Sequence, residues 1–350
     1  MNQKQGGAAY VGQRIEWLDA VRGMGIVLVV IGHAERGLIS AGFPMGSGWH
    51  YADFALYTFH MPLFFLLAGL NVRASLPRGR VAFLRNKLWT VAWPYLLWSL
   101  IQGGILVFFA RFTNGGAELR ELGAILWAPM AQFWFLYVLF AFHILVTATG
   151  ARAGILVPMA LLGLILGTFW PMYSLPQRLF HFLIFFVAGV LLTRPIKALP
   201  PLGTWAILAC LALFAALVGL PAWLVFPNHD APLAVPAAIF GIAAALLLAR
   251  RLTGRALDWA ALLGRASMTI FVLHILATAG TRIAMMLLGV PREPLLYLAV
   301  CTAVGVGGPL LADAVFARLG IKPLLGLAAP ARSRPEPKPE IQRRAGLSNP

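Results

Sequence analysis

The chain has 350 residues, of which 60% are hydrophobic and only 11% charged, whereas soluble globular proteins carry roughly 25% charged residues. Together with a mean hydropathy of +0.81, this composition excludes a water-soluble fold. The formal net charge of +16 would suit a nucleic-acid binder, but the basic residues occupy short gaps between apolar runs and form no soluble basic face. We therefore interpret the charge as a topology signal and expect no nucleic acid among the partners.

The two ends of the chain differ from the rest in composition. Residues 1–13 and the tail from about Ala331 are polar or Pro-rich and cannot bury enough apolar area to become ordered. We expect a flexible cytoplasmic N-terminus at 1–13, a transmembrane domain at 14–320 and a disordered cytoplasmic tail at 321–350. The first apolar run contains charges and lacks a small-residue cleavage site, so we expect it to be retained as a signal anchor.

A membrane-spanning helix needs about 20 mostly apolar residues, and cutting the chain at charges, prolines and glycine clusters leaves ten such runs. The predicted fold class is therefore an all-α, polytopic transmembrane bundle of about ten helices. The sixth run is the shortest. In chain order the runs are 18–38, 52–72, 87–110, 123–147, 153–170, 178–193, 202–221, 233–250, 266–289 and 295–318.

The loops between these runs alternate in charge, which orients the chain by the positive-inside rule. One set of loops, together with the tail, is rich in arginine and lysine, and the gap after the second run alone holds Arg73, Arg78, Arg80, Arg85 and Lys87. The opposite loops hold fewer basic residues, and most of these have an acidic neighbour. We therefore predict a multi-pass protein of a bacterial-type cytoplasmic (inner) membrane with both termini in the cytoplasm.

Ionisable side chains within a span cost about 2.5 to 3.5 kcal/mol each on insertion scales, so each one is a candidate functional residue. The first run, LDAVRGMGIVLVVIGHAE, holds Asp19, Arg22 and His33. Arg22 and His33 are eleven residues apart, close to three helical turns, which places them on one stripe about 16 Å apart. A structural interpretation also stands, with Asp19 and Arg22 as an interfacial pair and His33 as an interhelical hydrogen-bonding residue. For His33 we favour a functional role.

The second run, YTFHMPLFFLLAGLNVR, places His60 shortly before Pro62. Proline lacks a backbone donor and its ring clashes with the preceding turn, so we predict a bent or broken helix that opens a polar pocket. On this evidence His60 is a candidate for either a structural or a catalytic role. Two groups of residues receive ordinary interpretations. Interhelical hydrogen bonding competes with a functional role at His274, and it is favoured more strongly at His143 and His181. Interface anchoring is the simpler interpretation of Trp49, Tyr51, Trp170 and Tyr173.

Several motifs follow one another in a recognisable order. The first run reads L-D-x-x-R-G from Leu18 and ends in Gly-His at His33; the second reads H-M-P-L-F-F-x-x-A-G from His60. A Trp-Pro-Tyr triplet at 93–95, a WFLYVLF segment at 134–140 and LGRASMTIFVLH ending at residue 274 come later. Over about residues 14–320 this series resembles the acyltransferase 3 family of membrane O-acyltransferases, including its fucose 4-O-acetylase-like members.

The resemblance implies transfer of an acyl group, commonly from acetyl-CoA, to a sugar hydroxyl of a glycan. Histidine is the side chain best suited to remove that hydroxyl proton near neutral pH, so His33 is the candidate general base. Arg22 is a candidate for stabilising the oxyanion, binding the donor or keeping the surroundings of His33 polar. Glu35 lies roughly 200° round a regular helix from His33, so it orients the imidazole only if the helix ends near Gly32. A covalent acyl-histidine relay is a further route.

The same resemblance predicts which residues bind the donor. The phosphates of acyl-CoA would pair with the cytoplasmic basic residues Arg73, Arg85 and Lys87, although these charges would also be present if they only set topology. Two departures from the family pattern are Arg85-Asn86-Lys87, where Arg-x-x-Arg is more common, and Ala68, where serine is more common. We predict no metal, because Cys210 and Cys301 have no ligand-spaced partner.

Two other classes of protein fit the same composition. A transporter or flippase of a glycan or lipid-linked sugar also needs many spans with a few intramembrane charges, and a non-catalytic membrane scaffold needs only the spans. The predicted partners of the acyltransferase are acyl-CoA, a glycan or sugar acceptor, and membrane lipid. The sequence leaves the acceptor, the acyl chain length and the oligomeric state open.

Overall fold

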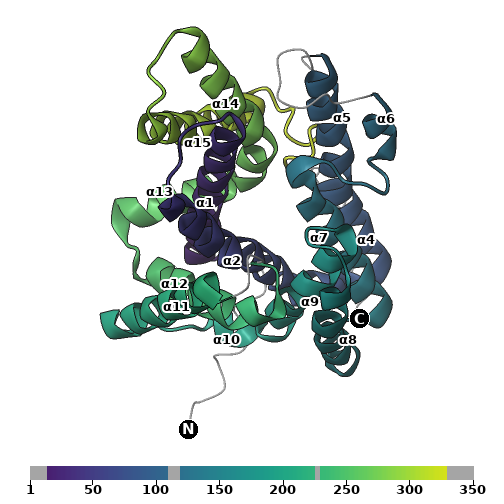
Figure 1. The fold of residues 1–350 in the computed structure, drawn as a ribbon. Helices are drawn as coiled ribbons and strands as arrows, with labels where there is room; N and C mark the ends of the chain where they lie inside the picture. Colours follow the sequence, from purple (N-terminus) through teal and green to yellow (C-terminus); the bar gives the residue numbers. More distant parts are fainter. Residues whose placement is uncertain (1–13, 109–118, 225–228, 329–350) are drawn as a thin grey trace, which may run out of the picture.

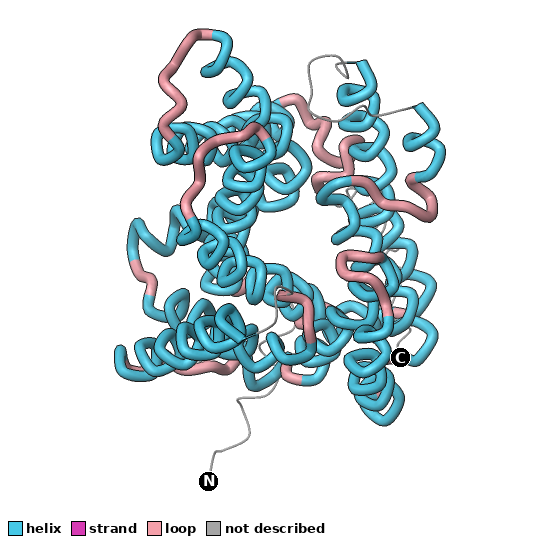
Figure 2. The backbone as a smooth tube through the Cα atoms, in the orientation of Figure 1, coloured by secondary structure: helices cyan, strands magenta, loops and turns pink. Residues whose placement is uncertain are grey.

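The computed structural model describes residues 14–108, 119–224 and 229–328. Helices and the turns that join them make up this part of the chain, and no strand occurs within it (Figure 2). The predicted all-α fold class is confirmed. The predicted flexible N-terminus at 1–13 and residues 329–350 of the predicted tail lie outside the described residues.

Ten apolar helical segments occur in the described part of the chain, seven long enough to cross a bilayer and three shorter ones. Each overlaps one predicted run in the predicted order, including the sixth. The helices that carry them are α1 (Glu16–Ser40), α2 (Ser47–Gly69), α5 (Trp93–Phe108), α7 (Trp134–Thr149), α8 (Ala153–Leu166), α9 (Leu175–Leu191), α11 (Thr204–Leu224), α12 (Val235–Arg251), α14 (Ser267–Leu287) and α15 (Pro294–Arg318).

Short helices connect or extend these segments. The third span begins before α5, because α4 (Arg80–Lys87) continues through a π-helical turn, η2 (Leu88–Ala92), directly into α5. The remaining connecting elements are α3 (Val72–Ser75), η1 (Leu76–Arg78), α6 (Leu119–Ala124), η4 (Ala131–Phe133), η5 (Gly167–Phe169), α10 (Thr193–Lys197), η6 (Pro232–Ala234) and α13 (Gly254–Arg265).

Helix α1 is the centre of one group of helices, in which it packs against α2, α12, α13, α14 and α15 (Figure 1). The α1–α13 contact brings backbone against backbone. A Cβ atom added at Gly23 would lie 1.9 Å from the carbonyl oxygen of Ala260, and one at Gly264 would lie 1.8 Å from that of Asp19. Gly23, the glycine after Arg22 in the first motif, is therefore required by packing. Helix α13 lies between two predicted runs and was not predicted as a separate helix.

Helix α2 joins this group to a second one, formed by α4, α7, α8 and α9, because it also packs closely on α9. The two helices meet at Gly69 and Gly189. An added Cβ at Gly69 would lie 2.2 Å from the carbonyl oxygen of Phe186, and one at Gly189 would lie 2.0 Å from that of Leu66. Small residues of this kind let helices in a bilayer approach closely enough for van der Waals packing to hold them.

Two features differ from the predictions. Helix α2 runs unbroken through Pro62, so of the predicted bend or break the break is absent, because neighbouring helices let a buried helix tolerate a proline. Residues 321–328, predicted to belong to the disordered tail, are ordered against α5. The indole N–H groups of Trp93 and Trp98 donate to the carbonyl oxygens of Leu324 and Leu325 at 2.8 and 3.0 Å. The predicted boundary of the tail at residue 321 is therefore too early.

Candidate active site

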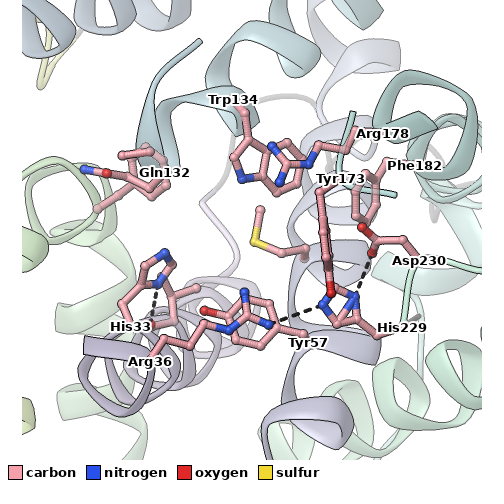
Figure 3. Close-up of a pocket in the computed structure, with 14 residues that line it drawn as sticks. His33, Arg36, Tyr57, Gln132, Trp134, Tyr173, Arg178, Phe182, His229 and Asp230 are labelled. Carbon is pink, nitrogen blue, oxygen red and sulfur yellow. Dashed lines mark hydrogen bonds and ion pairs between the residues drawn. The ribbon is translucent and has the colours of Figure 1, made fainter. Parts of the chain in front are cut away.

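A cavity of about 210 Å³, here called the outer cavity, lies beside the C-terminal half of α1 and is lined by His33 (Figure 3). Its walls come from α1, α2, α9, α14, the turn before α7 and the segment before α12. The other polar or aromatic residues that line it are Arg36, Tyr57, Gln132, Trp134, Tyr173, Arg178, Phe182, His229, Asp230 and Phe271. Most of these groups carry hydrogen-bonding atoms, so the cavity suits a polar ligand.

The His33 imidazole is held in one tautomer. Its Nδ1 lies 2.9 Å from the carbonyl oxygen of Val29, and because a carbonyl oxygen only accepts, Nδ1 carries the proton and donates it. Nε2 then has its lone pair available, as a general base requires. The ring of His274 lies edge-on to that of His33, with 4.9 Å between the centroids. His274 lines none of the cavities described here, and its own Nδ1 bonds to carbonyl oxygens of its helix.

A chain of polar contacts crosses the floor of the outer cavity. Arg36 donates to both carboxylate oxygens of Asp53, at 2.7 and 2.8 Å, and also to Nε2 of His229 at 3.3 Å. Nδ1 of His229 therefore carries the ring proton and donates it to Asp230 at 3.1 Å. The Arg36 guanidinium lies 3.3 Å from the ring centroid of Tyr57. Figure 3 shows Arg36, His229 and Asp230 in this order along one side of the cavity.

We expect the Arg36–Asp53 pair to behave as one unit. Arg36→Met removes two charge-assisted hydrogen bonds and leaves the Asp53 carboxylate without its partner, so the free energy of unfolding should fall by about 2 kcal/mol. Adding Asp53→Asn removes the unpaired charge and should recover part of this loss. Thermal unfolding of the two single variants and the double variant in detergent measures the coupling. Additive losses would contradict the pairing.

Two residues at the outer cavity hold strained backbone. Ala131 and Tyr173 have φ angles of 44° and 61°, which side chains with a Cβ rarely adopt, and such strain often marks functional sites. Hydrogen bonds fix the Tyr173 segment: its N–H donates to Oε1 of Gln177 at 3.0 Å, and Nε2 of Gln177 donates to the Asp230 carbonyl at 3.1 Å. Tyr173, interpreted from sequence as an interface anchor, is thus part of the cavity wall.

Burial shifts the pKa values of the adjacent loop residues His229 and Asp230 in opposite directions. Desolvation raises the pKa of the Asp230 carboxyl to about 7, although the charge of Arg178 opposes this shift. Desolvation also lowers the pKa of the His229 imidazole to about 3, and Arg36 adds to that effect. The pair therefore remains neutral where the unfolded chain would hold a carboxylate and an imidazolium.

These shifts predict how stability depends on pH. The ordinary pKa values of the two groups are 3.8 for Asp230 and 6.5 for His229. Between these pH values Asp230 holds a proton only in the folded state and His229 only in the unfolded state, so their contributions to the pH dependence of the free energy of unfolding cancel. In Asp230→Asn only the His229 contribution remains, and the free energy of unfolding should rise with pH over this window. In His229→Gln it should fall. Thermal unfolding at several pH values distinguishes these slopes, and parallel profiles for the two variants would contradict the assignment.

A second cavity, here called the inner cavity, lies beside the N-terminal half of α1 and has a volume of about 700 Å³. Arg22 lines it and binds Asp19 at 2.7 Å, and Asp19 also accepts from Arg14. Lys87 and Lys197 are further basic residues of its lining. A third cavity, of about 1030 Å³, adjoins it through Lys197 and is also lined by Arg73, Arg80 and Arg194. The N-terminal end of α1 is thus surrounded by cationic side chains.

The structure divides the predicted site residues among several places. His33 lines the outer cavity, Arg22 and Lys87 line the inner cavity, and Arg73 lines the third. Three predicted residues line none of these cavities: His60, Glu35 and Arg85.

The three outlying residues have different surroundings. His60 is fully buried behind Tyr57, with 4.6 Å between the ring centroids. Glu35 is buried on another face of α1, and because α1 remains helical to Ser40, the condition under which Glu35 would orient His33 is not met. Arg85 is exposed on α4.

Sequence reasoning missed most of the outer cavity. Arg36 and Arg178 belong to the opposite, less basic loops, whose charges were used only to orient the chain, and Asp53, Tyr57, His229 and Asp230 were not considered. One signal was available, because His229 and Asp230 are adjacent ionisable residues between two apolar runs. Nothing in the sequence, however, shows that this loop reaches Arg36.

The helical bundle, with an imidazole facing one cavity and basic side chains around another, defines a multi-pass membrane protein with an enzyme-like interior. Residues 15–313 match the Acyl_transf_3 family, described as an acyltransferase domain, and the chain belongs to this family. It is therefore a multi-pass member of a family of membrane acyltransferases, and the resemblance found from the motifs is confirmed.

One relative is the nodulation protein NolL of Sinorhizobium fredii (strain NBRC 101917 / NGR234). It is 32% identical over 139 residues, which cover 36% of this chain and 37% of that protein. The match therefore spans little more than a third of either chain. No solved structure matches the chain at a significant level.

Proposed function

We propose that the protein transfers an acyl group, in the first instance acetyl, from acyl-CoA to a sugar hydroxyl of a surface or exported glycan. The observation that carries this proposal is the position of His33. Its Nε2 is available at a polar cavity, while the other end of the same helix stands among basic residues in a separate cavity. One helix thus connects a base suited to a hydroxyl acceptor with a site suited to an anionic donor.

The donor is assigned to the inner and third cavities. Acyl-CoA carries phosphates, which arginine and lysine recognise by charge-assisted hydrogen bonds. Arg73 and Lys87, both predicted for this role, line these cavities together with Arg22 and Lys197. Arg85 does not, so we assign it to topology. Because Arg22 is about 16 Å along the helix from His33, donor binding is the role that best fits its position.

The acceptor is assigned to the outer cavity. Sugar hydroxyls both donate and accept hydrogen bonds, and the cavity offers both kinds of partner in Gln132, Arg178 and Asp230. The acceptor oxygen attacks the thioester carbonyl carbon while Nε2 of His33 takes the hydroxyl proton. The carbon–sulfur bond then breaks, and the proton passes to the leaving CoA sulfur, so that an ester and free CoA result. A relay through an acyl-His33 intermediate would give the same products.

The charges of the loops support a proposed orientation of this chemistry in the membrane. The basic cavities belong to the face that we propose to be cytoplasmic, where acyl-CoA is made, with both termini on that side of a bacterial-type inner membrane. The outer cavity then faces the compartment through which exported glycans pass. We propose that the reaction uses no metal.

Glycan chemistry tests the proposal directly. Surface glycans from cells with and without the protein are compared by mass spectrometry, and purified protein in detergent is given radiolabelled acetyl-CoA with the glycan fraction of cells that lack it. We expect acyl-bearing glycans only in its presence, and label in the glycan fraction. Uptake of glycan into vesicles without any acyl transfer would instead support a transporter and overturn the proposal.

A further inference from the structure

The inner and outer cavities approach each other along α1 without sharing a lining residue. Phe64 and Phe135 line the inner cavity, and Phe271 lines the outer cavity. These three phenylalanines come from α2, α7 and α14, so the boundary between the cavities is made of rings from three different helices. We call this set of three rings the aromatic septum.

The rings of the septum touch in sequence. The centroids of Phe64 and Phe135 are 6.1 Å apart, and those of Phe135 and Phe271 are 5.6 Å apart, both in edge-to-face arrangements. Phe65, which is fully buried, packs on Phe135 from behind at 4.9 Å. Edge-to-face rings at these separations attract one another by about 0.5 to 1.5 kcal/mol. The septum is thus closed by weak contacts. Phe64 and Phe135 are only half-buried, so their rings can rotate away and break these contacts.

Helix α1 forms the wall opposite these rings. Arg22, Gly25, Val29 and His33 follow one another at spacings of three and four residues, so they form one stripe of the helix. Arg22 lines the inner cavity, and Val29 and His33 line the outer cavity. A Cβ atom at Gly25 would lie 3.1 Å from the ring of Phe64, so the missing side chain makes room for the septum. At 1.5 Å per residue, Arg22 and Val29 are separated by about 10 Å.

We propose that the aromatic septum selects the acyl group by size, and that Phe135 is its specificity-determining residue. The inference rests on the proposed function, because a donor in the inner cavity must bring its thioester to His33 through this boundary. Phe135 is the central ring, in contact with both of the others. An acetyl group needs only a small displacement of the rings. Each additional methylene must displace aromatic side chains that are packed on two sides.

The proposal predicts the acyl selectivity of the protein. Membranes containing it are given radiolabelled acetyl-, propionyl-, butyryl- or hexanoyl-CoA with the glycan fraction of cells that lack the protein. For the wild type, kcat/KM should fall by about tenfold or more for each added methylene, the range in which a fitted pocket excludes larger groups. In Phe135→Ala the ratio of butyryl to acetyl transfer should rise by about tenfold or more. Phe135→Leu, a milder truncation, should give a smaller rise in the same direction.

The matched control is Phe142→Ala. Phe142 lies two turns further along α7, is buried, and contacts Phe65 at 5.4 Å, but it lines neither cavity. The Phe142→Ala substitution should lower the free energy of unfolding and leave the butyryl-to-acetyl transfer ratio unchanged. The septum would be ruled out as selector if the wild type transferred acetyl and the butyryl-to-acetyl ratio were the same in the wild type, the Phe135 variants and the Phe142→Ala control. No transfer from any donor by folded wild-type protein would instead overturn the proposed function, and the inference with it.

Discussion

Acyl transfer should be lost in His33→Ala, with kcat lower by about 10²- to 10⁴-fold, the range that a positioned general base contributes. The imidazole is held by the Val29 carbonyl so that Nε2 remains available. His229 also lines the cavity and carries its proton on Nδ1, but its Nε2 accepts from Arg36. Label transferred from acetyl-CoA to glycan, measured with purified protein, gives the rate. Because His33 is partly buried at the edge of a cavity, alanine should leave the fold intact, and thermal unfolding checks this.

His60→Ala is the matched control for His33→Ala. His60 makes the same type of bond, from Nδ1 to the carbonyl four residues earlier, at 2.6 Å, but it stands behind Tyr57 and lines neither cavity. We expect a smaller loss of acyl transfer in His60→Ala, because that substitution can affect the outer cavity only by displacing Tyr57. Undiminished transfer in His33→Ala would remove the basis of the proposed mechanism, and equal losses in the two variants would mean that the outer cavity is not where the reaction occurs.

The sequence predicted those features whose cause is local. Apolar runs long enough to span a bilayer are set by composition alone, and all ten appear as helices in the described residues. The stripe that joins Arg22 to His33 follows from the helical repeat. The same repeat indicated that Glu35 would not orient the His33 imidazole in a regular helix, and the structure agrees because α1 remains helical past Gly32. Local patterns are less reliable where packing intervenes. The helix break considered at Pro62 does not occur, because neighbouring helices stabilise α2 there.

The outer cavity was hidden because it depends on contacts between distant residues. Arg36 and His229 are separated by 193 positions and meet only after α12 has packed against α1 and α2. A charged residue that only sets topology cannot be distinguished in the sequence from one that lines a cavity. Arg178 is an example, because it lines the outer cavity. The septum was equally hidden, since phenylalanines in apolar runs are ordinary until three of them from three helices are seen to meet.

A single methyl group added at Gly189 should have a large effect on folding. Its added carbon would lie 2.0 Å from the carbonyl oxygen of Leu66, and a backbone atom cannot move aside as a side chain can. Gly189→Ala should therefore force α2 and α9 apart and lower the free energy of unfolding by about 3 kcal/mol or more. Activity should fall with it, because α2 carries Tyr57 and α9 carries Arg178, which line opposite sides of the outer cavity.

The control is Gly280→Ala on α14, where an added Cβ would meet no atom within 4 Å. Within a helix that substitution should be neutral or stabilising by up to about 1 kcal/mol. Thermal unfolding in one detergent compares the two variants, and Gly69→Ala should resemble Gly189→Ala, because its Cβ meets the Phe186 carbonyl oxygen from the other side. If Gly189→Ala were as stable as Gly280→Ala, α2 and α9 would have to be further apart than described. The outer cavity, whose walls they form, would then be wider as well.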